Sequence, residues 1–149
     1  MASRMTTPAS ITSILTERRN NMSEARFTIY PQIEVNLMES DIDDIMATAL
    51  DGAIGYWCRK AEVVEAERRP GKTHEQISKN GILILHSANS DEKWELTRGM
   101  FLRGLKLYFE KGSHVHVEDN FVDCEDMFSN DADCIIQFAL FGEIRFNED

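Results

Sequence analysis

The sequence has little cysteine and no long apolar run, and both absences limit the classes of protein to which it can belong. Three cysteines among 149 residues, without a Cys-x-x-Cys spacing, are an odd and sparse set. They argue against a disulfide framework and favour reduced thiols. No 18 apolar residues run together, so we expect no membrane span. The first residues lack the apolar stretch of a secretory signal. We therefore expect a protein of the cytoplasm.

Sequence motifs for phosphate binding and catalysis are missing as well. Gly52, Gly55 and Gly81 form neither G-x-G-x-x-G nor G-x-x-x-x-G-K, the patterns that cradle phosphates. No H-E-x-x-H, G-x-S-x-G or kinase pattern occurs. A basic stripe with interleaved aromatic residues is also absent, which disfavours direct nucleic-acid binding. The sequence therefore favours a protein that is not an enzyme, and it indicates no catalytic residues and no cofactor.

What the sequence has in excess is negative charge. The chain carries 26 acidic and 16 basic residues, a formal charge of −10. Residues 31–55 hold six carboxylates and no cation, whereas residues 113–149 hold ten carboxylates against Arg145. Like charges gathered in blocks repel one another unless something compensates them. One interpretation is a solvated face with carboxylates at helix N-termini. The other is a surface that meets a basic partner.

Hydrophobic periodicity predicts the fold class. An apolar content of 42 % is enough for one core in a chain of this length. We expect residues 1–25 to form an N-terminal arm or short helix, and residues 26–149 to form a single domain. That domain is predicted to be α+β, a small antiparallel sheet packed against about three helices. Period-two and helical patterns predict strands near 27–38, 62–68, 82–87 and 93–97 and helices near 41–57, 98–111 and 131–141.

Capping and turn residues predict where the elements begin and end. Ser40 and Thr97 are each expected to cap the helix that follows, because a hydroxyl accepts a bond from a free backbone N–H. Asn80, which precedes a glycine, predicts the positive φ of a helix exit. Residues 113–117 are expected to be extended, and the acidic stretch 118–126 to be a loop apart from Phe121 and Val122. Alternation at 144–146 predicts a final strand.

A pair of histidines is the feature of the sequence that most suggests a metal-binding or catalytic site. On a strand, alternation places His114, His116 and Glu118 on one face, and Asp119 and Asp123 follow closely. Imidazole with carboxylate is an ordinary ligand set for zinc or another transition metal. Two histidines beside an acidic loop are also common on surfaces without any metal. A metal-binding module or metal-dependent enzyme centred on His114 and His116 is therefore kept as an alternative function.

The cysteines are weaker candidates for chemistry. Cys58 adjoins Arg59 and Lys60, and neighbouring cations lower a thiol pKa, but adjacency in sequence does not establish a catalytic geometry. Cys134 falls on the apolar face of a predicted helix, which favours a buried structural thiol. Cys124 and Cys134 could join the histidines as ligands, although their spacing does not require it.

Several stretches of the domain carry a resemblance. These are Ser40–Ile45, Gly52–Cys58, Glu75–Gly81, Trp94–Leu96 and Ala132–Ile144. Together they resemble a group of small proteins encoded by phages, prophages and mobile elements of Gram-positive gut bacteria, over residues 33–146. The resemblance brings no catalytic or binding residues with it. It implies an accessory protein of such an element, and small acidic proteins of this kind often inhibit host defence systems, as anti-CRISPR proteins do.

Charge and resemblance together predict a stoichiometric inhibitor of a basic host protein, such as a nucleic-acid-binding nuclease. Its carboxylates would meet lysines and arginines that otherwise grip phosphate, and binding would depend strongly on salt. We expect neither nucleic acid nor a membrane as partner. The predicted contact residues are Glu39, Asp41, Asp43, Asp44, Glu118, Asp119, Asp123, Glu125, Asp126 and Asp131. A further alternative is a homo-oligomer that sequesters a nucleotide signal through Arg68, Arg69 and Tyr56.

Overall fold

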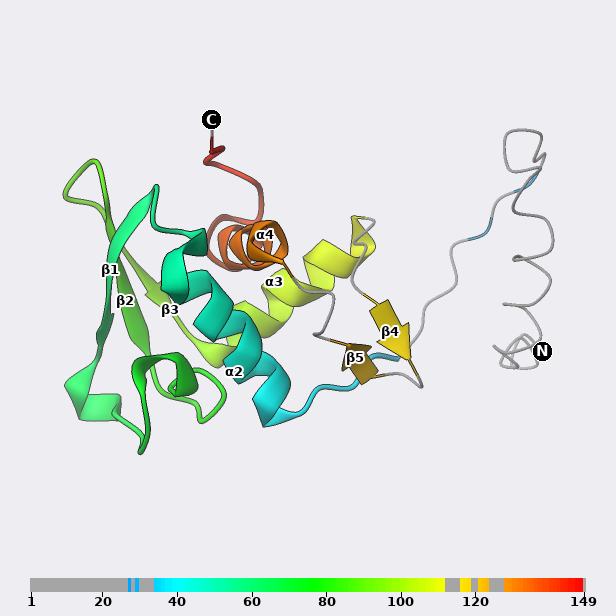
Figure 1. Ribbon diagram of the computed structural model, residues 1–149, viewed down its shortest axis with the longest axis horizontal. Coiled ribbons are helices and arrows are strands. Elements are labelled where there is room, and N and C mark those ends of the chain that lie inside the picture. Colours follow the sequence, from blue (N-terminus) through cyan, green and yellow to red (C-terminus); the bar gives the residue numbers. More distant parts are fainter. Residues whose placement is uncertain are drawn as a thin grey trace. The chain divides into compact units, whose positions relative to one another are not determined.

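The computed structural model of the chain describes residues 34–111, 116–118, 121–123 and 128–148, together with residues 27 and 29. Contacts divide the chain into two units, Met1–Ile33 and Glu34–Asp149, and the elements drawn in colour in Figure 1 belong to the second. The predicted arm at 1–25 lies outside the described residues. No helix of the described part is long and apolar enough to cross a bilayer.

A three-stranded antiparallel sheet forms one layer of this unit. Its strands are β1 (Cys58–Val63), β2 (Leu83–Ser87) and β3 (Lys93–Leu96), in the order β1-β2-β3. Leu83, Leu85 and Ser87 are buried, whereas the residues between them are only half-buried. This alternation shows that one face of the sheet meets the core and the other meets solvent. The predicted strands near 82–87 and 93–97 are confirmed.

Two of the predicted strands are wrong. The first strand of the sheet covers 58–63 instead of 62–68, and Glu65–Glu67 form a 3-10 turn. A forked ion pair from Arg68 to Glu65 closes that turn, with both nitrogen–oxygen distances at 3.0 Å. In the predicted strand at 27–38, the described residues 27, 29 and 34–38 contain only an isolated bridge residue, Asn36.

Three α-helices complete the described part of the fold, which is therefore α+β. They are α2 (Glu39–Thr48), α3 (Arg98–Glu110) and α4 (Ser129–Phe141), and they lie on one side of the sheet (Figure 1). α2 ends earlier than the predicted residue 57, because the chain passes into a π-turn, η3 (Ala49–Ala53). Gly52 ends the regular helix there at φ +123°, a conformation that residues with a side chain rarely adopt.

The helix caps differ in part from the prediction. The cap of α2 is Met38, not Ser40, and its backbone N–H donates to Asp41 Oδ2 at 2.8 Å. Thr97 caps α3 as predicted, since its hydroxyl accepts from Met100 N at 3.3 Å. Asn80 has the predicted positive φ, at +70°. A carboxylate at the third helical position can replace a capping hydroxyl because it reaches back to a free N–H.

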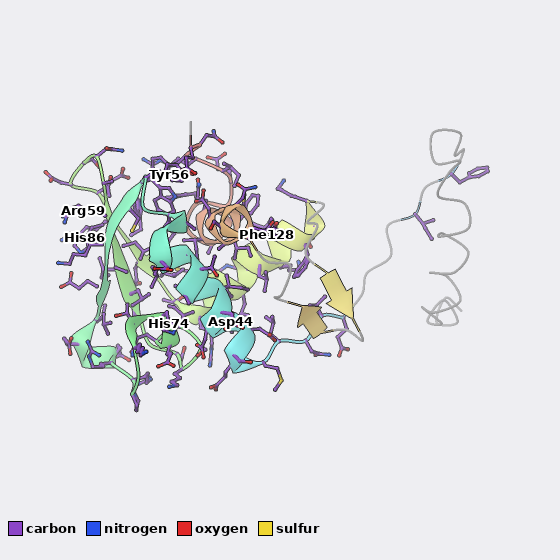
Figure 2. The ribbon with its side chains drawn as sticks, viewed as in Figure 1. Asp44, Tyr56, Arg59, His74, His86 and Phe128 are labelled. Atoms are coloured by element: carbon purple, nitrogen blue, oxygen red, sulfur yellow. The ribbon has the colours of Figure 1, made fainter. Side chains whose placement is uncertain are left out.

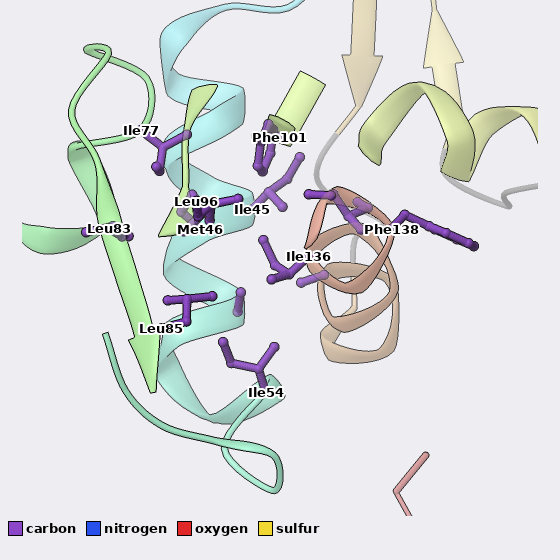
Figure 3. Packing of buried hydrophobic residues seen from close by; sticks show 14 of the residues in the cluster. Ile45, Met46, Ile54, Ile77, Leu83, Leu85, Leu96, Phe101, Ile136 and Phe138 are labelled. Carbon is purple, nitrogen blue, oxygen red and sulfur yellow. The ribbon is translucent and has the colours of Figure 1, made fainter. Parts of the chain in front are cut away.

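The core lies between the sheet and the helices. Figure 3 shows Ile45 and Met46 of α2 packed against Leu85 of β2, Phe101 of α3 and Ile136 of α4. All five side chains are completely buried. Burying side chains of this size contributes about 1.5–3 kcal/mol each relative to exposure, so this cluster holds α2 against both layers.

A short hairpin crosses the acidic stretch that was predicted to be a loop apart from Phe121 and Val122. Its strands, β4 (His116–Glu118) and β5 (Phe121–Asp123), pair antiparallel with His116 opposite Asp123. The predicted final strand at 144–146 is absent, because these residues belong to no strand.

Candidate functional site

Two of the α2 carboxylates predicted to bind a partner already act within the fold. Asp41 accepts the hydrogen bond from the backbone N–H of Met38 and so caps the helix. Asp43 Oδ1 accepts a hydrogen bond from the Ser78 hydroxyl at 2.6 Å, which ties α2 to the turn that precedes β2. Neither carboxylate is fully exposed.

The exposed carboxylates of this region form what we call the acidic ridge: Glu39, Asp44 and Asp51. Asp44 projects from the outer face of α2 (Figure 2). Asp51 lies beyond the end of α2, in η3, where the backbone leaves helical geometry. Within the described residues, no ion pair joins the acidic ridge to a cation.

Asp131 does not belong to the partner-binding surface, and its predicted role is corrected. The residue is only 1 % exposed. Its Oδ2 atom accepts from the backbone N–H of Phe128 at 2.9 Å, and its Oδ1 atom accepts from the Tyr108 hydroxyl. A carboxylate buried between a helix cap and a phenol cannot reach a partner.

The other predicted contacts lie in or around the β4–β5 hairpin. The structure describes the backbone of Glu118 and Asp123 but not their side chains. Asp119, Glu125 and Asp126 lie outside the described residues, as does His114. No group of three or more His, Cys, Asp or Glu side chains in the described part could hold a metal ion. The predicted metal site at His114 and His116 stays a prediction.

Neither described cysteine is placed as a nucleophile. Cys58 is buried, and burial raises the pKa of its thiol more than neighbouring Arg59 lowers it. Cys134 is half-buried, and its pKa is raised by burial and then by the carboxylates of Asp133 and Asp131. Both thiols therefore stay protonated at neutral pH, whereas a nucleophilic cysteine needs a thiolate.

The three residues predicted to bind a nucleotide signal, Tyr56, Arg68 and Arg69, lie apart in the structure. Tyr56 precedes β1, whereas Arg68 and Arg69 follow it. Six residues of strand span about 20 Å. Arg69 is also engaged locally, because its Nε donates to the Lys79 carbonyl at 3.1 Å. The structure does not bring the three together.

A polar hollow of about 510 Å³ opens beside Asp51, and sequence reasoning missed it. Its walls come from η3, the first half of α4 and the segment after α4. The charged residues among its lining are Asp51, Asp133 and Glu148, and the lining contains no Lys, Arg or His. Because Asp51 belongs to both features, the hollow continues the acidic ridge.

Asp133 lines this hollow and is only 7 % exposed. Its Oδ1 atom accepts from the indole Nε1 of Trp57 at 2.8 Å and from Gln137 Nε2 at 2.9 Å. Its Oδ2 atom accepts from the Tyr56 hydroxyl at 2.5 Å. Burial and this bond to Asp133 raise the pKa of Tyr56, so the phenol keeps its proton. All three donors are neutral, and the carboxylate has no cationic partner within the described residues.

The same glutamine fixes the segment after α4, residues 144–148. Gln137 Oε1 accepts from the backbone N–H groups of Arg145 and Phe146 at 2.8 and 2.7 Å. Its Nε2 group donates to the Phe146 carbonyl at 3.0 Å. The spacing of Asp133 and Gln137, four residues apart on one helix, is the sequence signal that could have revealed this network.

Comparisons with protein-family models, with curated proteins and with solved structures find no match for the chain.

Proposed function

We propose that this protein binds a basic protein surface, and that a lysine or arginine of that partner enters the polar hollow. The observation that carries the proposal is the lining of the hollow: Asp51, Asp133 and Glu148 supply its only formal charges. A hollow lined by one sign of charge concentrates ligands of the opposite sign.

The arrangement suits a side chain with a long stem and a cationic head. Asp51 and Glu148 are exposed, so a guanidinium entering the hollow would meet their carboxylates before it approached Asp133. Hydrogen bonds between guanidinium and carboxylate are about twice as strong as neutral ones. The acidic ridge beside the hollow would meet further cations and speed the encounter.

The partner class follows from this chemistry. Surfaces with clustered lysines and arginines are those that grip nucleic-acid phosphates. We propose that the partner is such a protein, a defence nuclease of a host cell, and that the carboxylates inhibit it by occupying its phosphate-binding cations. The activity needs no catalytic group on this chain, and it would take place in the host cytoplasm.

An NMR titration of the full chain with N-acetyl-arginine amide tests whether the hollow binds a guanidinium. We expect the amide signals of Asp51, Asn130 and Gln137 to shift, with little change on the outer face of the sheet. The matched control is the citrulline derivative, which has nearly the same shape without the charge. Equal shifts with citrulline, or no shift around the hollow with arginine, would show that the hollow does not select a cation.

The metal alternative keeps one specific observation in its favour. The hairpin register sets His116 opposite Asp123, and residues directly opposite on antiparallel strands are close neighbours. Elemental analysis of protein purified without a histidine tag tests it. A stoichiometric metal that disappears in His116→Ala would support a metal function.

A further inference from the structure

The segment 144–148 lies on the body of the protein without being part of its secondary structure. None of its residues belongs to a helix or strand. Hydrogen bonds join the backbone of Arg145 and Phe146 to side chains of the body. Gln137 accepts from both N–H groups, and Gln137 and Tyr56 both donate to the Phe146 carbonyl. A side chain that binds the backbone of two successive residues holds a peptide whatever side chains that peptide carries.

An aromatic slot receives the side chain of Phe146. Its ring stacks on Trp57 with centroids 5.2 Å apart and planes within 7°. Trp94 and Phe141 meet the same ring edge-on, at 6.1 and 5.9 Å. Stacked and edge-on pairs at these distances contribute about 0.5–1.5 kcal/mol each beyond the burial of their area. The slot is therefore selective for a flat aromatic ring.

A third subsite holds the guanidinium of Arg145. Two of its nitrogens donate to the carboxylate of Glu92 at 2.9 and 3.4 Å. The same group lies over Phe141 and Trp94, 5.1 and 5.8 Å from the ring centroids. A carboxylate together with aromatic faces is a site for arginine rather than lysine. A guanidinium can donate two hydrogen bonds to one carboxylate and, because it is planar, can also stack on an aromatic ring.

We propose that these three subsites form a peptide-recognition groove for a segment in which an arginine precedes an aromatic residue, and that residues 144–148 occupy it in cis. The partner is a protein that carries such a dipeptide. Tyr56, Gln137 and Phe146 also line the hollow, whereas Glu92 and Trp94 do not, so the groove is inferred from contacts that the proposed function does not use. Gly142, at φ +74°, ends α4 and lets the segment turn back onto the groove.

Because residues 144–148 of the same chain already occupy the groove, a free peptide must compete with them for binding. A tethered segment competes at an effective concentration in the millimolar range, so a free peptide binds weakly to the unaltered chain. Phe146→Ala in the full chain removes the anchor and opens the aromatic slot. The probe is an amidated peptide with the sequence of residues 142–148, Gly-Glu-Ile-Arg-Phe-Asn-Glu.

Tryptophan fluorescence reports the binding directly, because the only two tryptophans of the chain, Trp57 and Trp94, both line the groove. We expect Phe146→Ala to bind the peptide at least about tenfold more tightly than the unaltered chain, since the competing segment is removed. A peptide with alanine at both the arginine and phenylalanine positions should not bind. Adding Gln137→Met, which keeps the size but loses the amide, should abolish binding. A folded Phe146→Ala that does not bind the peptide would overturn the proposal.

Amide hydrogen exchange of the unaltered chain gives a second test that needs no variant. A segment that leaves its groove reversibly exposes the amides of Arg145 and Phe146 without global unfolding. We expect both to exchange at least about a hundredfold faster than the amide of Leu85 in the central strand. Exchange at the rate of Leu85 would make the segment a fixed part of the core and would overturn the proposal. If Phe146→Ala does not fold, this hydrogen-exchange test is sufficient to decide the proposal.

Discussion

Trp57 and Asp133 are joined by a buried hydrogen bond, in which the indole Nε1 donates to Oδ1 across 2.8 Å. The bond connects the turn before β1 with α4, two elements far apart in the sequence. The same carboxylate also accepts from Tyr56 and Gln137. One charged side chain therefore organises both the hollow and the groove beside it.

Replacing Asp133 with asparagine should destabilise the fold. The variant keeps the volume, but one of the two oxygens becomes an NH2 group that faces a donor. A buried donor left without a partner costs about 1–3 kcal/mol, so we expect the free energy of unfolding to fall by about 2–3 kcal/mol. Urea unfolding measures this. The control is Asp44→Asn on the acidic ridge, which should change stability by less than about 0.5 kcal/mol. Equal stability of Asp133→Asn and the unaltered chain would contradict the role given to Asp133.

Stability should also fall at alkaline pH because of Tyr56. Its pKa is raised in the folded state, first by burial and then by the hydrogen bond to Asp133. In the unfolded chain a tyrosine loses its proton near pH 10. The stabilisation is therefore complete below about pH 10 and declines as the pH rises above it, because deprotonation then favours the unfolded state.

Tyr56→Phe provides the comparison for that pH dependence. It should be less stable than the unaltered chain at neutral pH, because the hydrogen bond to Asp133 is lost, and the difference should shrink above pH 10. Chemical unfolding at a series of pH values measures both chains. A difference that is constant from neutral to alkaline pH would show that Tyr56 is not responsible.

At Gly104, α3 packs closely against α4 because glycine has no side chain. A Cβ atom there would lie 2.5 Å from the backbone nitrogen of Ala139. Because backbone cannot step aside, we expect Gly104→Ala to destabilise the protein by about 1–3 kcal/mol. Gly99→Ala, near the start of the same helix, has no contact closer than 3.9 Å and should be neutral or stabilising by up to about 1 kcal/mol. Thermal unfolding separates the two, and similar melting temperatures would refute the close packing.

Gln76 is a second buried glutamine that holds a backbone segment. It is completely buried; its Oε1 atom accepts from Arg69 N and its Nε2 group donates to Arg69 O, both at 2.8 Å. We expect Gln76→Met to cost about 2 kcal/mol, because the hydrogen bonds to the Arg69 backbone disappear with little change of volume. Glu65→Gln, which breaks an exposed ion pair of the same loop, should cost less than about 1 kcal/mol. Equal effects of the two substitutions in urea unfolding would contradict this account.

The sequence predicted those elements whose signals are local. β2 and β3 have the apolar residues that strands require, and Thr97 caps α3 with its own hydroxyl. The end of α2 could not be read in the same way. Its apolar spacing continues through Ala53, but the backbone leaves helical geometry at Gly52, in a segment that packs against α4. Contacts between distant elements overrode the periodicity there.

The candidate site was harder to predict than the fold, because a charge count treats every carboxylate alike. Asp131 and Asp44 look equivalent in the sequence, yet one caps a buried helix end and the other is exposed. Which carboxylate turns inward depends on donors such as Tyr108 and Trp57, which come from other elements. The hollow around Asp133 depends on the same tertiary contacts and has no local motif.

The affinity for a basic partner, measured against charge reversal and salt, tests the central claim most directly. A partner captured from host-cell extract with the unaltered chain would be purified and its binding measured by calorimetry. We expect Asp44→Lys with Asp51→Lys to weaken binding at least about thirtyfold, whereas Glu95→Lys with Glu110→Lys, which changes the net charge equally on other surfaces, should weaken it less than about threefold. Raising the salt from about 0.05 to 0.5 M should weaken the unaltered complex at least about tenfold. Binding that is indifferent to salt, or equally sensitive to both pairs of substitutions, would contradict a role for the acidic ridge and its hollow.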